Sequence, residues 1–296
     1  VELGEKRPDV VGVTAAMLHP VGLAPFAARH PDRVFDVGIA EQHAVTSAAG
    51  MAVAGLHPVV ALYSTFLNRA FDQLLMDAGL HHEGVTIVLD RAGITGTDGA
   101  SHNGMWDMAM CGIVPGLMLS APRDCQHLVS VLNEAVDIND RPTVIRYSKD
   151  PMPDDIRVVA SHDGLDVLRD GPGDGILLVA HGQLCAPALA AVDQLDFPVR
   201  VVSPRWSLPV CRGLIEEAAE ARAVVSVEDG LVVSGLGSHL ADALSRRGLW
   251  RPIRNLGIPQ RYLGHDSRSA IMAELGLDAP GIADAVSQLV SQLGGE

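Results

Sequence analysis

The stretch Arg33-Val-Phe-Asp-Val-Gly-Ile-Ala-Glu-Gln-His43 joins a β-branched run to a helix of small residues, and it decides the fold. Residues 34–37 predict a short buried strand that ends at Gly38. Residues 39–55 are rich in Ala, Ser and Gly and predict a helix that can approach a neighbouring backbone closely. Glu41 begins that helix. Two roles are open for this residue. Its carboxyl group is either a catalytic acid inside a protein interface or a structural helix-start carboxylate stabilised by the helix dipole.

Apolar runs of strand length alternate with helical stretches along the chain. The predicted strands are 10–15, 34–37, 58–63, 85–89, 116–120 and 143–147 in the first half, and 176–180, 199–203, 223–228 and 252–256 in the second. This alternation is typical of α/β domains, so we predict two doubly wound domains with mainly parallel sheets. A Pro- and Asp-rich passage separates them. We therefore divide the chain into a domain at 1–150, a linker at 151–164 and a domain at 165–296.

Composition restricts the possible partners. The chain has 296 residues, 48% of them hydrophobic, and a formal net charge of −14, so nucleic acid or an anionic membrane surface would be repelled. No apolar run approaches the roughly 20 residues of a membrane span, and no signal peptide is visible. The four cysteines lack the spacing of a metal site or a disulfide framework. We expect a cytoplasmic protein that holds any anionic substrate with local arginines.

Two further stretches carry polar groups that packing alone does not require: Tyr63-Ser-Thr-Phe-Leu-Asn-Arg-Ala-Phe-Asp-Gln73 and Asp90-Arg-Ala-Gly-Ile-Thr-Gly-Thr-Asp-Gly-Ala-Ser-His-Asn-Gly104. With the Glu41 segment, in this order, they resemble the pyrimidine-binding domain of the 1-deoxy-D-xylulose-5-phosphate synthases, thiamine-diphosphate enzymes of the transketolase superfamily. The resemblance continues through Arg141-Pro-Thr-Val-Ile-Arg-Tyr147 and, more weakly, to Ala273-Glu-Leu-Gly-Leu277. It implies a transketolase-like pyrimidine-binding domain followed by a transketolase C-terminal domain.

The resemblance implies roles for three residues. Glu41 would protonate the aminopyrimidine ring of thiamine diphosphate, a task that suits a carboxylic acid in a dry interface. Phe66 would stack on that ring, although taken alone it reads as a core residue of a helix that starts near Thr65. His102, in a Gly-rich loop, would exchange protons with the reacting substrates. Glu41 and Phe66 are thus predicted to bind the cofactor, and Glu41 and His102 to act in catalysis.

The implied substrates are pyruvate and glyceraldehyde 3-phosphate, which carry a carboxylate and a phosphate. The residues at the family's substrate-binding positions are Tyr63, Arg69, Arg91, Asp98 and Arg146. Arg91 and Arg146 are the better phosphate candidates, because guanidinium groups grip phosphate with two parallel hydrogen bonds. The sequence departs from the family pattern just after Arg146. The segment Arg146-Tyr-Ser-Lys149 has Ser-Lys where the family commonly has Pro-Arg.

The family holds the cofactor diphosphate through Mg²⁺ in a further domain marked by a Gly-Asp-Gly signature. Here Gly173-Asp-Gly175 lies in a Pro/Gly-rich stretch and predicts a turn, so we predict no metal site in this chain. We expect the chain to lack the diphosphate-binding domain and to work with one, as part of a longer polypeptide or as a separate subunit, in a homodimer or heterotetramer.

Two other functions fit the sequence. The chain also fits the second subunit of a split transketolase-like enzyme or an oxo-acid dehydrogenase, and a non-catalytic paralogue that only binds a partner. The presence of Glu41, Phe66 and His102 together argues against the paralogue, which would need none of them.

Overall fold

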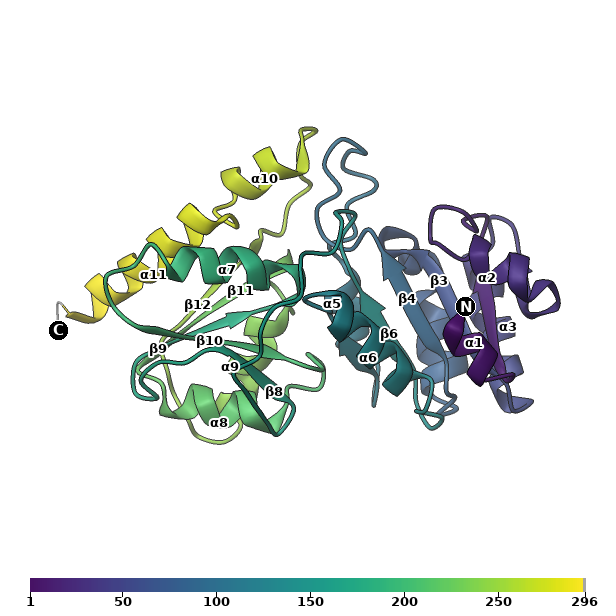
Figure 1. Ribbon diagram of the computed structural model, residues 1–296, viewed down its shortest axis with the longest axis horizontal. Helices are drawn as coiled ribbons and strands as arrows, with labels where there is room; N and C mark the ends of the chain where they lie inside the picture. The colour runs from purple at the N-terminus through teal and green to yellow at the C-terminus, as the bar shows by residue number, and fades with distance from the viewer. Residues whose placement is uncertain (295–296) are drawn as a thin grey trace.

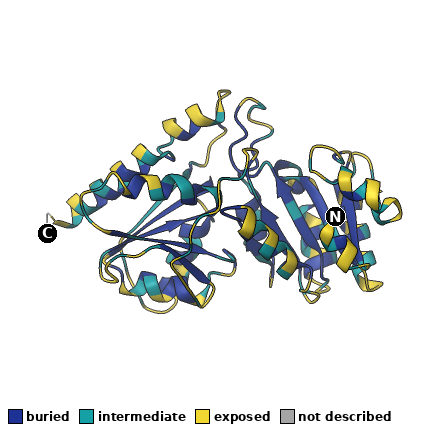
Figure 2. Cartoon of the chain, in the orientation of Figure 1, coloured by how far each residue is buried: buried dark blue, intermediate teal, exposed yellow. Residues whose placement is uncertain are grey.

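Short runs of Val, Ile and Leu form the strands of two six-stranded sheets. In the computed structural model, which describes residues 1–294, strands and helices alternate through both halves of the chain (Figure 1). The strands of a sheet covered on both faces need apolar side chains on both sides, and therefore read as continuous apolar runs. Figure 2 shows dark blue, buried strands beside helices whose outer surfaces are exposed. The predicted α/β class is confirmed.

The first sheet is parallel throughout, with the strand order β2-β1-β3-β4-β6-β5. Its strands are β1 (Val10–Thr14), β2 (Val34–Asp36), β3 (His57–Tyr63), β4 (Thr86–Asp90), β5 (Met118–Ser120) and β6 (Thr143–Arg146). The helices are α1 (Glu2–Lys6), α2 (Ala24–Arg29), α3 (Glu41–Val53), α4 (Phe71–Gln73), α5 (Asp107–Cys111) and α6 (Cys125–Ala135), with the 3₁₀ helices η1 (Pro31–Arg33) and η2 (Ser64–Ala70) and the π-helical η3 (Leu74–Gly79).

The second sheet is mixed, with the order β12-β11-β9-β10-β8-β7. Its strands are β7 (Ala160–His162), β8 (Leu165–Arg169), β9 (Ile176–Ala180), β10 (Val199–Pro204), β11 (Ala223–Leu231) and β12 (Ile253–Ile258). The helices are η4 (Gly182–Leu184), α7 (Cys185–Val192), α8 (Arg212–Glu220), α9 (Leu236–Ser245), α10 (Arg268–Glu274) and α11 (Ala279–Gly294). None of the helices within residues 1–294 has the length and apolar character needed to cross a membrane.

The structure differs from the sequence-based expectation at two places. The predicted burial of strand 34–37 is wrong: β2 is the outer strand of its sheet, and Phe35 is 40% exposed. The antiparallel strands β7 and β8 were not predicted, and β7 lies inside the passage interpreted as a linker. β7 is a three-residue edge strand, and β8 lies between β7 and β10 with Asp166 and Arg169 in its sequence, so both give a weak strand signal.

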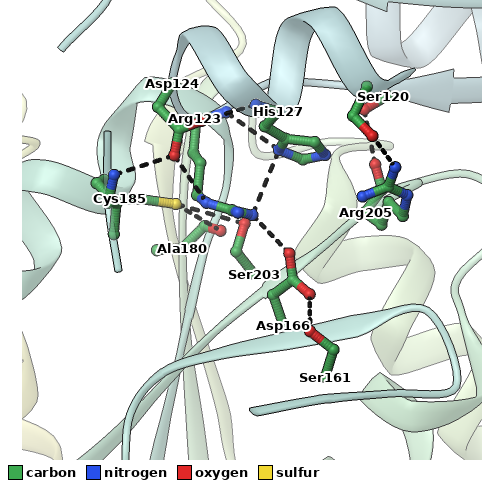
Figure 3. A network of polar contacts seen from close by, with 12 residues as sticks. Ser120, Arg123, Asp124, His127, Ser161, Asp166, Ala180, Cys185, Ser203 and Arg205 are labelled. Atoms are coloured by element: carbon green, nitrogen blue, oxygen red, sulfur yellow. Dashed lines mark hydrogen bonds and ion pairs between the residues drawn. The ribbon is translucent and has the colours of Figure 1, made fainter. Parts of the chain in front are cut away.

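The two sheets are joined through a polar junction (Figure 3). Arg123, just before α6, donates a 2.6 Å hydrogen bond from Nη1 to Asp166 of β8, and Asp166 also accepts one from Ser161 of β7. Asp124 caps α6 by accepting from the backbone N–H of His127 at 2.8 Å. Arg123, Asp124, His127 and Asp166 are buried, whereas Ser161 is exposed. Charged groups that hydrogen-bond across a buried junction fix how its two sides fit together.

This junction predicts an acid sensitivity. Burial, together with the positive charges of Arg123 and Arg205, lowers the pKa of His127 to about 4. An unfolded His titrates near pH 6.5, so the unfolded chain binds more protons between these pH values, and the stability that neutral His127 contributes is lost as the pH falls from about 6.5 towards 4. We expect the difference in unfolding free energy between the native chain and His127→Asn to change by about 2 kcal/mol between pH 7.5 and pH 5 in urea titrations. A constant difference would contradict this.

Candidate active site

Successive strands of the first sheet end at one edge and deliver the predicted site residues there. The register pairs Thr14 of β1 with Asp36 of β2, and Tyr63 of β3 with Asp90 of β4, so these parallel strands finish side by side. Glu41 follows β2, Phe66 follows β3, and Arg91 and His102 follow β4. The carboxyl edge of an open parallel sheet is where such folds bind ligands.

Glu41 is the first residue of α3 and is buried, with 7% of its surface exposed. The helix begins there because the small residues that follow, among them Ala44 and Ala48, pack fully into the core. The Glu41 carboxylate takes part in none of the hydrogen bonds or ion pairs found within residues 1–294. A buried carboxyl at a helix N-terminus with free acceptor atoms can receive a ligand nitrogen.

A cluster of rings forms where β3 and β4 end. The rings of Tyr63 and Phe66 stack with their centroids 5.8 Å apart and an interplanar angle of 10°. His102 meets Phe66 edge-on at 5.7 Å. The guanidinium carbon of Arg91 lies 4.0 Å from the centroid of the Tyr63 ring, which is within cation–π range. The structure thus brings four sequence-predicted residues into direct contact.

Arg91 is held in an unusual backbone conformation. Its φ is +59°, in the left-handed region that a residue with a side chain seldom adopts, and its Nη1 donates to Asp90 at 2.5 Å. Non-Gly residues in this region concentrate at functional sites, where surrounding structure maintains the strain. Burial raises the pKa of Asp90, although the charges of Arg91 and Lys149 oppose this shift.

Lys149 joins the cluster through Asp98. Its Nζ lies 2.9 Å from both Asp98 carboxylate oxygens. Burial raises the pKa of Tyr63, and the positive charges of Arg91 and Lys149 act against this shift. Lys149 was not among the predicted site residues. The signal that could have found it was the departure at Ser-Lys, since a cation remains where the family commonly has Arg.

Two of the predicted arginines, Arg69 and Arg146, are not among the residues found in contact in the ring cluster. Arg69 is exposed and follows Phe66 by one turn of η2, so the two side chains leave the same face of that 3₁₀ helix. Arg146, at the end of β6, is 4% exposed; its Nε donates to Asp107 at 2.6 Å, and its Nη2 donates to the carbonyl of Asp229 at 2.8 Å. This placement favours a structural role for Arg146 over phosphate binding, which stays a prediction.

The stretch Gly173-Asp-Gly175 lies in a turn before β9, as predicted. Across residues 1–294, no group of three or more His, Cys, Asp and Glu side chains is arranged to hold a metal ion.

The wholly parallel first sheet and the mixed second sheet, each flanked by helices, define a two-domain α/β protein. The chain belongs to the transketolase family: residues 1–154 match the transketolase pyrimidine-binding domain, and residues 165–282 match the transketolase C-terminal domain. The resemblance stated from the sequence is confirmed at this level.

Similar proteins agree with this assignment. The 1-deoxy-D-xylulose-5-phosphate synthase of Cutibacterium acnes is 92% identical over the whole chain, and the 1-deoxy-D-xylulose-5-phosphate synthase 2 of Streptomyces avermitilis is 53% identical. The chain covers 47% of each, so it spans about half the length of these curated relatives. Among solved structures, a split-gene transketolase described as an inactive β4 tetramer superposes with a TM-score of 0.83 at 28% identity, covering 97% of this chain and 93% of that one.

Proposed function

We propose that this chain supplies the pyrimidine-binding and C-terminal domains of a 1-deoxy-D-xylulose-5-phosphate synthase. The reaction joins two carbons of pyruvate to glyceraldehyde 3-phosphate with loss of carbon dioxide. The observation that supports this most strongly is the 92% identity with the Cutibacterium acnes synthase along all 296 residues. The retained acid, rings and cations at the sheet edge are consistent with it.

The residues at the edge fit thiamine diphosphate. When bound, this cofactor supplies the nucleophilic carbon for decarboxylation and carbon–carbon bond formation. Glu41 is a buried residue whose carboxyl has free acceptor atoms for a ring nitrogen, and it can hold a shared proton there. Phe66 offers a flat apolar surface to an aromatic ring. His102, packed against Phe66, lies where it can exchange protons with substrate.

The acceptor phosphate is assigned to Arg91 and Lys149. Arg91 lies over the Tyr63 ring, and Lys149 pairs with Asp98 in a partly exposed contact, so an anion can compete for it. A guanidinium and an ammonium together neutralise a phosphate dianion in this otherwise acidic chain. The Arg69 side chain leaves the same face of η2 as Phe66, and we assign it to the pyruvate carboxylate.

The complete enzyme needs parts that residues 1–294 do not provide. We assign Mg²⁺ and the cofactor diphosphate to a diphosphate-binding domain or subunit, and we propose that two copies of the enzyme associate. A cytoplasmic location accords with the scattered cysteines.

The experiment that tests the function uses the complete enzyme, in which this chain is fused to or mixed with a diphosphate-binding domain. With Mg²⁺ and thiamine diphosphate, we expect release of carbon dioxide from pyruvate that depends on glyceraldehyde 3-phosphate. The chain alone should show no turnover under the same conditions. Turnover by the chain alone, or an enzyme that ignores pyruvate, would reject the proposal.

The second candidate is a subunit of a split transketolase, which the 93% coverage of the split-gene transketolase chain favours. A transketolase takes its two carbons from a ketose phosphate, whereas the synthase takes them from pyruvate. Supplying the two donors separately with the same acceptor therefore separates the candidates.

Replacing Arg91 by Ala should weaken use of the phosphorylated acceptor more than use of pyruvate. A charge-assisted hydrogen bond contributes about 1.5–3 kcal/mol, which corresponds to a loss of roughly 10- to 100-fold in kcat/KM for glyceraldehyde 3-phosphate. The control is Arg212→Ala, which removes an exposed guanidinium paired within α8. Equal losses for both substrates would argue against a phosphate role for Arg91.

A further inference from the structure

The loop that carries His102 is anchored in the second half of the molecule. This segment, 93–104, leaves β4 of the first sheet, and Figure 1 shows it rising beside the segment that leads into α10. Ile94 and Met105, near its two ends, are fully buried and belong to the hydrophobic core formed by β9, β10 and β11 of the second sheet. The loop is thus fixed by residues distant in sequence.

Side chains from the second half hydrogen-bond to both backbone polar groups of one loop residue, Ile94. The N–H of Ile94 donates to Asp229 Oδ1 at 2.9 Å, and the carbonyl of Ile94 accepts from Arg268 Nη1 at 2.6 Å. Arg268 also pairs with Asp229 at 2.7 Å and with Asp150 at 2.6 Å. Its side chain is only 12% exposed, so these interactions are poorly screened.

Two glycines make this close approach possible. Gly93 and Gly96 have φ values of +73° and +74°. A Cβ at Gly93 would collide with the Asp229 carboxylate, and one at Gly96 would lie 2.5 Å from the backbone nitrogen of Arg268. The loop therefore touches Asp229 and Arg268 along its backbone, where a side chain could not fit.

We infer that Arg268 and Asp229 are positioning residues, which fix the 93–104 loop so that His102 faces the rings of the candidate active site. The first half holds the loop from the opposite side, since Thr65 donates to the carbonyl of Ser101 at 3.0 Å. His102 directly follows Ser101, next to Phe66. The residue after it, Asn103, accepts a 2.8 Å hydrogen bond from the backbone N–H of Thr95, which ties His102 to the Ile94 end of the loop. The role of the second half is then to set the geometry of the site. This inference rests on the proposed function.

The test compares Arg268→Met and Arg268→Lys in the full-length enzyme. The matched control is Arg261→Met, which removes an exposed guanidinium paired with Glu274 of α10. In Arg268→Met, hydrogen–deuterium exchange of peptides spanning 94–105 should accelerate about 10- to 100-fold, the factor that corresponds to one charge-assisted hydrogen bond, while β4 peptides stay unchanged. Arg268→Lys should restore part of the protection, and Arg261→Met should match the native enzyme.

The kinetic readout separates positioning from general destabilisation. Misplacing His102 should lower kcat by about 10- to 100-fold and leave the KM for pyruvate nearly unchanged. Unchanged loop exchange in an active enzyme, or a loss of kcat with accelerated exchange throughout the molecule, would overturn the inference. If Arg268→Met does not fold, Asp229→Asn gives the same comparison, because the amide keeps an acceptor for Ile94 but loses the charge that pairs with Arg268. The exchange measurement needs no substrate, so an inactive native enzyme would reject the proposed function alone.

Discussion

Glu41→Gln is expected to abolish most of the turnover of the full-length enzyme while leaving the fold intact. The amide has nearly the same shape as the carboxyl group, but it cannot hold a proton shared with a ring nitrogen. Loss of a positioned acid typically costs about 10²- to 10⁴-fold in rate. The direct measurement is hydrogen–deuterium exchange at the reactive carbon of bound thiamine diphosphate, which should slow by a similar factor.

The matched control for this change is Glu2→Gln. Glu2 also occupies the first turn of a helix, but it is exposed and distant in sequence from the ring cluster. Both variants lose one favourable interaction with a helix dipole, which is worth roughly 0.3–1 kcal/mol at such positions. They should therefore unfold at similar urea concentrations and differ only in turnover. An unchanged exchange rate at the cofactor in Glu41→Gln would leave Glu41 only its interaction with the helix dipole.

The central strands could be predicted from sequence because their side chains are buried on both faces. The predicted strand 176–180 coincides with β9, and 143–147 exceeds β6 by one residue. Burial of 34–37 could not be read correctly, because the sequence does not tell whether a strand has neighbours on both sides. β7 was missed because Ala160 and Ser161 are exposed and small or polar. β8 is mostly buried, but Asp166 and Arg169 interrupt its apolar run.

The residues of the candidate site could be predicted from the sequence more readily than the residues that hold them in place. Tyr63, Phe66, Arg91 and His102 lie in contact, and their motifs follow the strands β3 and β4. The role of Arg268 had no sequence signal, because it depends on a contact with Ile94 that is 174 positions away along the chain. Arg146 and Lys149 look interchangeable as cations in the sequence, and only burial distinguishes them.

Arg146→Met should therefore destabilise the protein strongly. Its partner Asp107 is fully buried and also accepts a 3.0 Å hydrogen bond from Ser64. Removing the guanidinium leaves the Asp107 charge without its counter-ion, a change that costs about 3–5 kcal/mol of unfolding free energy at a buried pair. Lys149→Met is the matched comparison: the Lys149–Asp98 pair is partly exposed, and losing such a pair costs about 0–1 kcal/mol.

The two variants also decide which cation serves the acceptor. If Arg146 is structural, Arg146→Met lowers the urea midpoint, and adding Asp107→Asn recovers part of the loss because the unpaired charge disappears. Lys149→Met should leave that midpoint nearly unchanged and raise the KM for glyceraldehyde 3-phosphate. The opposite pattern, a stable Arg146→Met protein with a raised KM for the phosphorylated acceptor, would restore the role that the sequence predicted for Arg146. It would also require the guanidinium to leave Asp107 and the Asp229 carbonyl when substrate binds.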